Sequence, residues 1–592
     1  MAYICVPLRC GLCRFNIDDG SKVVVVTIDG IFFDTHESSP LVELPDYTYI
    51  ECADASCERV CEHSDKQMMG CHSECYDLTT AEWRAGFFRI TAPKFEPPAT
   101  EDERRIRWLQ HYMIQFYKFP LPLPPELCTY IANYHLRGQE LHRCAAYYAL
   151  DTFPKVAGHI SSKFRITRGL RARYIAFEDA RYIAALKPTR TGSTRRDTSR
   201  RGTSRRRNDP DDSSYVIDTA WLAADHLGVR KIIFGNSTKP LLTSHRRPGV
   251  WWETVRLPIA GKIEAHTDSV KLRGLTQAGD SRATVMPRST IWAVPHPSPE
   301  LLRYHDLGQN HGLFRMVPFD CNKPEITGYS ALFHHRIMRI HAHTSNKDLR
   351  CYSTEECHGQ WTYFPIDEDE LVIAIWHCRF QMTPSDILLF LTSRGRVMVI
   401  GRHPRLSQLV PTFTILDCPA RGGHQLFYDY SSQGISLLAF QRPSPERNAN
   451  HAVFPIPESS YPVGAALEAY TFTSASLANI TELAACRTRG TDKPAILGLL
   501  FRYADGRRTS VGQVRLDYLA EPLEVKSSES MYLGFARTQD GCPYVDSIES
   551  FPSRRDITYL KISWEGNMEW WFSHRQCVVV KESCITSKGI NC

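Results

Sequence analysis

The spacing of hydrophobic and polar positions changes along the chain. Residues 22–33, KVVVVTIDGIFF, form two apolar runs around Asp29-Gly30, which predicts two strands joined by a tight turn. Between residues 104 and 136, apolar residues recur three and four positions apart, a spacing that predicts two helices. Pro124 and Pro125 lie between these stretches, where the second helix can begin. After residue 150, short apolar runs alternate with charged turns, which predicts strands.

The rest of the chain predicts a large, mainly-β body. Residues 386–401, 494–519 and 557–572 each contain two apolar runs around a glycine, so each predicts a strand pair. The pairs are unequally spaced and show no fixed period, which favours a sandwich, a barrel or a prism over a propeller. The stretch AADHLGV, residues 223–229, predicts a brief helix before a strand.

Length and charge narrow the class of protein. A chain of 592 residues is too long for one core, and 43% apolar with 23% charged residues is ordinary for a globular protein. The net charge of +6 arises mostly from one arginine-rich segment, so charge gives no indication of a nucleic-acid surface on the folded domains. No apolar run is long enough for a membrane helix, and the start lacks the apolar region of a signal peptide. We therefore expect no membrane association and a location in the cytoplasm or nucleus.

The arginine-rich segment covers residues 187–214 and is poor in apolar residues, so we expect it to be a disordered insert within one domain. Two interpretations stay open for its arginines. They could form a nuclear-import or RNA-contacting tail, or a solvated insert with no specific role. The arginines concerned are Arg195, Arg196, Arg200, Arg201 and Arg205 to Arg207.

Cysteines are concentrated at the N-terminal end. Of the 20 cysteines, eight fall within the first 75 residues, and a chain without a secretory signal is expected to keep them as thiols or metal ligands. Cys10 and Cys13 form a compact Cys-x2-Cys pair, and His72 and Cys75 lie three apart at the start of an expected helix. We predict that these four residues bind one structural Zn²⁺ ion in a closed tetrahedral site.

Other ligands remain open at this end of the chain. Cys71 could replace His72 in the first site. A second group could form a further site, although its spacings are looser, and buried free thiols are the alternative for both groups. The second group is Cys52, Cys57, Cys61 and His63.

The order of these features resembles a treble-clef zinc finger, as found in RING, PHD and related intracellular modules. A Cys-x2-Cys turn, a hairpin and a helix that begins with His72-x2-Cys75 follow one another. The resemblance implies a small zinc-stabilised module.

Residues 123–131 resemble the F-box motif. The residues that carry the resemblance are Leu123, Pro124, Glu126, Leu127 and Ile131. In that family, this opening and the helix after it dock onto a Skp-type adaptor of a cullin ubiquitin ligase. The resemblance therefore implies partner binding through these five residues. The alternative is a helical bridge between the zinc module and the β-body, because the same pattern can start any amphipathic helix.

Two strand pairs of the β-body are similar to those of jacalin-like β-prism lectins. They are LLFLTSRGRVMVIG, residues 388–401, and FRYADGRRTSVG, residues 501–512. The resemblance implies a possible prism fold and assigns no sugar-binding residues. The paired tryptophans could stack on a sugar or anchor a peptide, but they more often fill the interior of a β-fold. These are Trp251, Trp252, Trp570 and Trp571.

No catalytic motif is present. The chain lacks the phosphate loop, the dinucleotide fingerprint, the His-Glu-x2-His motif and the Gly-x-Ser-x-Gly elbow. His341 and His343 would share one face of a strand, and with His334 and His335 they could bind a metal. We interpret them as polar histidines of a half-exposed strand. We therefore expect that the protein is not an enzyme.

Together these observations predict a multidomain α+β protein that resembles fungal F-box-like proteins. We expect a zinc module (1–95), an F-box-like helical segment (96–150), a β-rich domain that contains the insert (151–300) and a second β-rich domain (301–592). The expected function is a non-enzymatic adaptor or substrate receptor that binds a Skp-type adaptor and a protein substrate. The alternative is a lectin-like module that binds carbohydrate or protein.

Overall fold

The structure is a computed structural model. The described residues are 3–18, 20–27, 32–37, 39–40, 47–51, 68–79, 87–116, 123–136, 138–152, 160–165, 170–188, 217–237, 247–257, 262–277, 290–295, 302–308, 313–346, 348–352, 359–380, 386–403, 411–431, 434–441, 459, 470–489, 495–526, 528–581 and 584–585.

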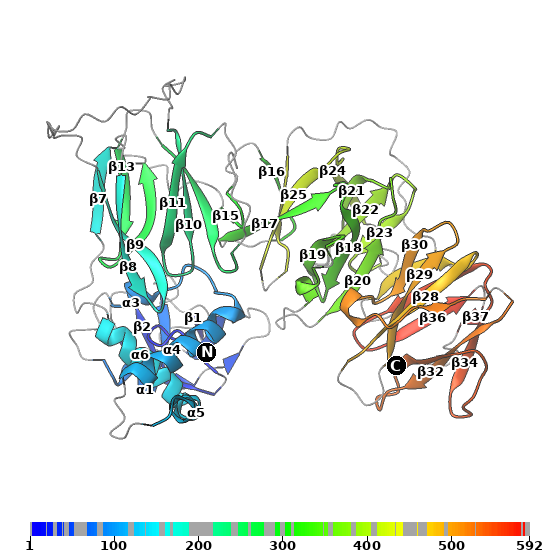
Figure 1. Cartoon of the computed structure of the whole chain (residues 1–592), viewed down its shortest axis with the longest axis horizontal. Coiled ribbons are helices and arrows are strands. Elements are labelled where there is room, and N and C mark those ends of the chain that lie inside the picture. The colour runs from blue at the N-terminus through cyan, green and yellow to red at the C-terminus, as the bar shows by residue number, and fades with distance from the viewer. Residues whose placement is uncertain are drawn as a thin grey trace, which may run out of the picture. The chain divides into compact units, whose positions relative to one another are not determined.

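The protein is mainly β, with several separate sheets and few helices (Figure 1). It divides into two units, Met1–Pro299 and Glu300–Cys592. In the described part of the chain, no helix is both long and apolar enough to cross a membrane.

Two three-stranded sheets open unit 1. The first has the order β1 (Tyr3–Pro7), β5 (Tyr47–Glu51), β4 (Ser39–Pro40), and the second β3 (Phe32–Glu37), β2 (Lys22–Thr27), β6 (Met68–His72). β2 and β3 pair antiparallel, which confirms the strand pair predicted at residues 22–33. β6 pairs with the other edge of β2 and ends at His72.

The helices of unit 1 follow these sheets. They are α1 (Ser73–Tyr76), α3 (Phe87–Thr91), α4 (Ala99–Phe116), α5 (Pro125–His135) and α6 (Gln139–Thr152). α4 and α5 confirm the two helices predicted between residues 104 and 136. Glu101 and Asp102 lie in the first turn of α4, where the helix dipole favours acidic side chains, and Pro125 opens α5.

The remaining strands of unit 1 form three antiparallel groups. In the first, β8 (Leu170–Phe177) pairs with β9 (Ala180–Pro188). The second has the order β14 (Leu272–Gln277), β13 (Lys262–Thr267), β7 (Ile160–Arg165). The third has the order β11 (Val229–Gly235), β10 (Thr219–Ala224), β12 (Trp251–Arg256), β15 (Thr290–Trp292).

The helix predicted at residues 223–229 is wrong. β10 and β11 pair directly, and the residues between them form a tight turn. Asp225 accepts hydrogen bonds from the backbone N–H groups of Leu227 and Gly228. A short aspartate side chain that bonds to the next backbone groups stabilises a turn in competition with a helix.

One hydrophobic core of unit 1 joins the N-terminal sheets and the helices to β8 and β9. It includes Val25 from β2, Leu109 from α4, Ala146 from α6 and Tyr182 from β9. In this core, helices α4 and α6 therefore pack on the segments that contain Cys10, Cys13 and Cys75.

Unit 2 contains further antiparallel sheets. One set of paired strands has the order β17 (Phe314–Cys321), β25 (His424–Asp429), β26 (Leu437–Gln441), β16 (Leu302–Asp306), and a three-stranded sheet has the order β19 (Ile337–Thr344), β18 (Ile326–Phe333), β20 (Gln360–Pro365). Two four-stranded sheets have the orders β23 (Val397–Ile400), β22 (Asp386–Thr392), β21 (Val372–Arg379), β24 (Thr412–Asp417) and β27 (Thr471–Ser476), β35 (Asn567–Phe572), β36 (Cys577–Lys581), β37 (Cys584–Ile585). The last sheet has the order β31 (Leu523–Glu524), β28 (Ile480–Arg487), β29 (Ile496–Tyr503), β33 (Pro543–Glu549), β32 (Met531–Arg537), β34 (Thr558–Ile562), and β30 (Arg508–Gly512) also pairs with β29. Two 3₁₀ turns, η4 (Arg350–Tyr352) and η7 (Leu516–Tyr518), also lie in this unit.

Two of the three predicted strand pairs are confirmed and one is wrong. β22 pairs with β23 and β29 with β30, with Gly395 and Gly506 at positive φ in the turns. β34 and β35 do not pair: β34 joins β32, whereas β35 joins β27 and β36. The two apolar runs enter different sheets, because each pairs with strands that are distant in the sequence.

The paired tryptophans fill the interior. Trp251, Trp252, Trp570 and Trp571 are all buried. They do not offer an exposed platform for a sugar ring.

Candidate metal centre

The Cys10-x2-Cys13 segment forms a tight turn. The N–H of Cys10 donates to Phe15 O over 2.9 Å, and the N–H of Arg14 donates to Cys10 O over 2.9 Å. Arg14 adopts the left-handed conformation, with φ of 62°. Space around Gly11 is tight, because a Cβ there would lie 2.7 Å from Cε of Met69 and the end of that side chain would have to shift. Its N–H donates to Gly70 O over 2.8 Å, which fixes the turn against β6.

The second pair of ligands comes from the junction of β6 and α1. β6 ends at His72, which is the N-cap residue of α1, and Cys75 follows within the first turn of this helix. The change from extended to helical backbone at His72 turns both side chains toward the Cys10-x2-Cys13 turn.

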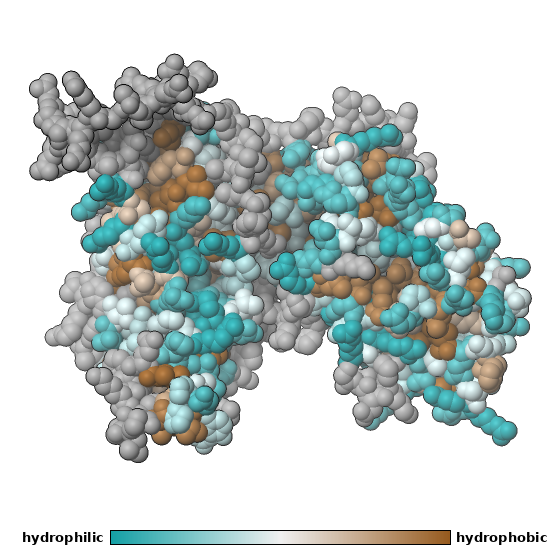
Figure 2. All heavy atoms as spheres, in the orientation of Figure 1, coloured by the Kyte–Doolittle hydropathy of each residue, from teal (hydrophilic) through white to brown (hydrophobic). Residues whose placement is uncertain are grey.

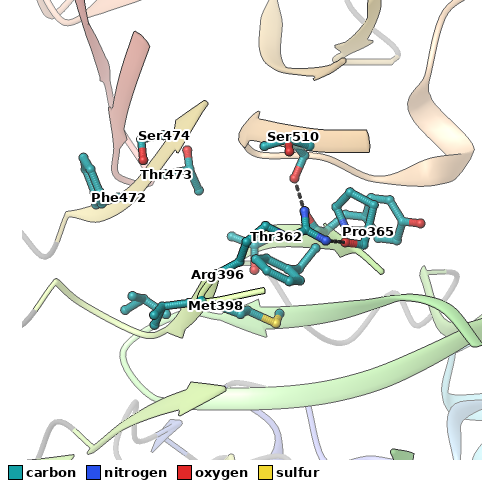
Figure 3. A pocket seen from close by; sticks show the side chains of 14 residues that line it. Thr362, Pro365, Arg396, Met398, Phe472, Thr473, Ser474 and Ser510 are labelled. Carbon is teal, nitrogen blue, oxygen red and sulfur yellow. Dashed lines mark hydrogen bonds between the residues drawn. The ribbon is translucent and has the colours of Figure 1, made fainter. Parts of the chain in front are cut away.

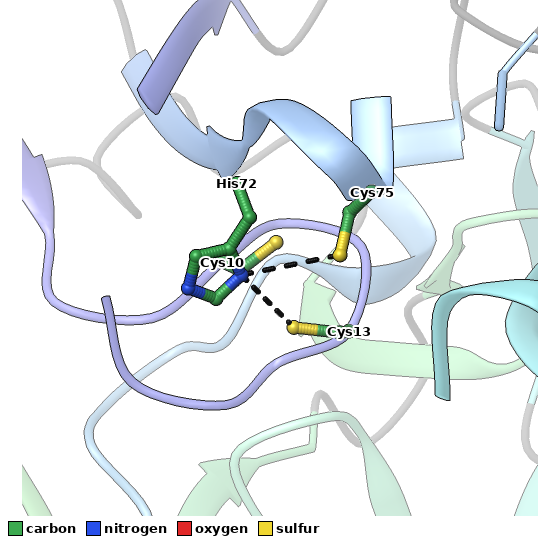
Figure 4. A group of neighbouring side chains, drawn as sticks. All are labelled: Cys10, Cys13, His72 and Cys75. Carbon is green, nitrogen blue, oxygen red and sulfur yellow. Dashed lines mark hydrogen bonds between the residues drawn. The ribbon is translucent and has the colours of Figure 1, made fainter. Parts of the chain in front are cut away.

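The structure brings Cys10, Cys13, His72 and Cys75 into one group, with their four ligand atoms all within 4.8 Å of one another (Figure 4). Nδ1 of His72 lies 3.4 Å from Sγ of Cys13 and 3.9 Å from Sγ of Cys75. Ligands in a tetrahedral zinc site are separated by about 3.5–3.8 Å, given Zn–S and Zn–N bonds of about 2.3 and 2.0 Å. The donor set and its spacing therefore fit a metal ion such as zinc.

The group is closed to solvent. Its side chains are 0 to 2% exposed, and all its cysteines are free thiols. Burial raises the pKa of Cys10, but hydrogen bonds with Cys13, Cys71, Cys75 and His72 outweigh burial and hold the pKa well below its usual value. The pKa of Cys13 is raised well above its usual value, chiefly by burial, and that of Cys75 is raised by hydrogen bonds with Cys10 and Cys13. The low pKa of Cys10 thus marks one thiolate in the group, the form in which cysteine binds metal.

Cys71 lies beside the group and not within it. It is fully buried on β6 and hydrogen-bonds to Cys10. His72 is the residue that joins the three cysteines, whereas Cys71 was the predicted substitute for it. The other predicted ligands, Cys52, Cys57, Cys61 and His63, lie outside the described residues.

Two arginines hold the carbonyl groups of the turn. Nη2 of Arg105, on α4, donates to Cys13 O over 2.7 Å, and Nη1 of Arg9 donates to Arg14 O over 2.9 Å. Arg105 is 1% exposed, so its charge needs a partner inside the protein. These contacts tie the position of the turn to α4.

Glu178 provides that partner. It lies in the β8–β9 turn and forms ion pairs with Arg105, at 2.9 Å, and with Arg14. Burial alone would raise its pKa, but Arg105, Arg14 and Arg104 lower it to about 2. No local spacing in the sequence predicts these ion pairs, because Glu178 lies more than 70 residues from each arginine.

α6 also reaches the centre. The ring of His142 stacks on that of His72, with centroids 4.1 Å apart and an angle of 4° between the planes. Oε1 of Glu74 lies 3.7 Å from Nδ1 of His142. The centre is therefore enclosed by side chains from α1, α4 and α6.

The residues predicted to bind an adaptor lie on and before α5. Pro124, Glu126 and Leu127 are exposed, and Leu123 and Ile131 are half-buried. Leu127 is 50% exposed, and Tyr130 and Tyr134, which were not predicted, are 70% and 68% exposed. Figure 2 shows the surface of this lower part of unit 1, where Figure 1 places α5.

A pocket of about 400 Å³ lies within unit 2, between β20, β23, β27 and β30. Its lining combines hydroxyl groups with aromatic and aliphatic side chains. Figure 3 labels Thr362, Arg396, Met398, Phe472, Thr473, Ser474 and Ser510 around it. These residues come from four separate strands, so no local pattern in the sequence predicts that they share a pocket.

No family model matches the chain, and no curated protein is similar to it in sequence. Function must therefore be argued from the geometry of these sites.

Proposed function

We propose that this protein is a non-enzymatic adaptor or substrate receptor, and that α5 binds a Skp-type adaptor of a cullin ubiquitin ligase. The observation that carries the proposal is the exposed apolar face of α5. Leu127, Tyr130 and Tyr134 are spaced three and four residues apart, so they lie on one face of the helix. Apolar side chains gathered on an exposed face mark interaction sites.

The two faces of α5 differ in a way that supports docking. Cys128, Ala132 and Leu136 are buried, so one face packs within unit 1. A helix that served only as a bridge would bury its apolar residues on the protein itself. The exposed face instead suits a groove on a partner, as amphipathic helices commonly do.

In this proposal the metal centre is a structural, treble-clef-like zinc site. It anchors α4 through Arg105 and α6 through His142, and these are the helices on either side of α5. Zinc binding would thereby set the position of the docking helix. The residues that hold the ion supply folding energy and need no open coordination position.

The experiment is co-purification of the full chain with a purified Skp-type adaptor. A Leu127→Asp, Tyr130→Asp double variant is expected to bind at least 30-fold more weakly, because removal of a hot spot costs about 2 kcal/mol or more. Phe551→Asp is a matched control, since Phe551 in unit 2 is 70% exposed, as is Tyr130. No capture of the adaptor by the folded, zinc-loaded wild type would contradict the proposal.

The alternative is a lectin-like carbohydrate-binding module, and the pocket of unit 2 favours it. The residues that line the pocket include Thr473, Ser474 and Ser510, whose hydroxyl groups can hydrogen-bond, and the aromatic residue Phe472. Sugars bind through hydrogen bonds of this kind and through contact with aromatic rings. A glycan array with the wild type and a Ser474→Trp variant, which fills the pocket, tests this function. Binding that the variant abolishes would support it.

A further inference from the structure

The strand histidines singled out in the sequence acquire a third partner in the structure. His341 and His343 lie on the same face of β19, with ring centroids 4.7 Å apart. Cys351, in η4, joins them, and one ligand atom from each residue lies within 4.8 Å of the other two. Two imidazole nitrogens and one sulfur are the donors that zinc and similar transition metals prefer.

The position of Cys351 is fixed by the residue that follows it. The hydroxyl of Tyr352 lies 2.7 Å from Oγ of Ser330 and 3.1 Å from Nε2 of His343. Its ring packs edge-on against Trp361, and Nη2 of Arg515 donates to Tyr352 O over 3.0 Å. η4 is thus held from both sides, which keeps the sulfur of Cys351 beside the two histidines.

Buried hydroxyl groups orient the central histidine. Nε2 of His343 lies 2.8 Å from Oγ of Ser330, and both residues are buried. Such a hydrogen bond on one ring nitrogen fixes the orientation of the ring, as the outer partners of metal-binding histidines do. In known metal sites the second ring nitrogen of a histidine ligand is nearly always held in this way.

The outer side of the group is accessible. His341 and Cys351 are half-buried, so an ion can reach the three donors. The neighbouring carboxylate, Asp348, is engaged with Arg350 through contacts of 2.9 and 2.7 Å. The group therefore offers three protein ligands and room for a fourth from solvent.

We propose that His341, His343 and Cys351 form a second metal site, in unit 2, that binds a divalent transition-metal ion, zinc foremost. With three ligands and an open position, this site differs from the closed centre of unit 1. It does not depend on the function proposed for α5.

The first experiment adds Co²⁺ to the full chain, purified with zinc in the N-terminal centre, while zinc release is monitored. The wild type is expected to take up one additional ion, with visible bands of four-coordinate cobalt and a thiolate-to-cobalt charge-transfer band. Cys351→Ser should abolish the charge-transfer band, and His341→Ala should weaken binding by at least about 100-fold, beyond the effect of losing an outer hydrogen bond. The control variants Cys418→Ser and His335→Ala alter an exposed cysteine and an exposed histidine of the same unit. They should change neither the charge-transfer band nor the affinity for cobalt.

A second experiment needs no variant. Alkylation of Cys351, followed by peptide mass spectrometry, should slow at least tenfold when zinc is added and recover with a chelator. Cys418, an exposed thiol, serves as the control within the same molecule. Equal alkylation of Cys351 with and without zinc, or cobalt uptake without a thiolate band, would overturn the proposal.

Discussion

The two Cys/His groups of this protein use similar ligand atoms in opposite surroundings. The N-terminal group has four donors, all buried, on two segments separated by about 60 residues of sequence. The group in unit 2 has three donors, of which two are half-buried, on a strand and a nearby 3₁₀ turn. Enclosure decides what a metal ion could do: a closed site stabilises a fold, whereas an open one can exchange its ion or accept another ligand.

The surroundings also differ in how they hold the ligands. Around the N-terminal group, Arg9, Arg105 and Glu178 fix the backbone of the cysteine turn with buried charges. In unit 2, the neutral hydroxyls of Ser330 and Tyr352 fix one imidazole ring. Failure of the first arrangement should unfold part of the protein, and failure of the second should weaken only metal binding.

The largest effect is expected from Cys75→Ser. Structural zinc contributes about 10 kcal/mol or more to the folding of small domains, so loss of one ligand should lower the free energy of unfolding of unit 1 by at least about 5 kcal/mol. Chemical denaturation and zinc content measure the result. Cys128→Ser, at a buried cysteine of α5 outside the group, should cost about 1 kcal/mol. Equal effects of the two variants would show that the group does no more than fill space.

A smaller effect is expected from Glu178→Gln. The change leaves Arg14 and Arg105 buried without a carboxylate, which typically costs about 3–5 kcal/mol. Asp179→Asn is the control, since Asp179 is the exposed neighbour in the same turn and should stay within about 0.5 kcal/mol. If the Glu178→Gln variant is as stable as the control, the buried ion pairs of Glu178 do not stabilise the centre.

Glu178 also makes stability depend on pH. Its pKa falls from 4.5 to about 2 on folding, so its contribution is complete above about pH 4.5 and is lost as the pH falls toward 2. A shift of this size corresponds to about 3 kcal/mol. Denaturation of unit 1 between pH 5 and pH 3 should show the loss in the wild type, and the slope should be smaller in Glu178→Gln.

The smallest effect concerns unit 2. Ser330→Ala removes the hydrogen bond to Nε2 of His343 and should lower the metal affinity of that group about 10- to 100-fold, while the zinc content of the N-terminal centre stays unchanged. Competition with a chelating dye measures the affinity. An unchanged affinity in a folded variant would mean that the contact with Ser330 is not needed, and that Tyr352 and packing suffice to position the ring of His343.

Local patterns carried most of what the sequence could predict. The Cys-x2-Cys and His-x2-Cys spacings pointed to the N-terminal group, because each pair lies within one turn of the backbone. Helical spacing found α4 and α5, and glycine-centred apolar runs found the β22–β23 and β29–β30 pairs.

What the sequence could not supply depends on distant partners. The runs around Gly566 looked like a hairpin, but the partners of β34 and β35 lie in different sheets. Cys351 joined the histidines because Tyr352 docks on Ser330 and Trp361, contacts that no local period encodes. The exposure of Tyr130 and Tyr134 likewise depends on which face of α5 is covered by the rest of unit 1.

The most direct test is hydrogen–deuterium exchange of the zinc-loaded full chain before and after a chelator is added. We predict that loss of the ion increases exchange in the cysteine turn, α1, α4 and α6, since all contact the centre, and that the β22–β21 and β28–β29 strands of unit 2 keep their protection. Unchanged exchange in α4 and α6, in a protein shown to have lost its zinc, would contradict the claim that the N-terminal centre organises unit 1 and positions α5.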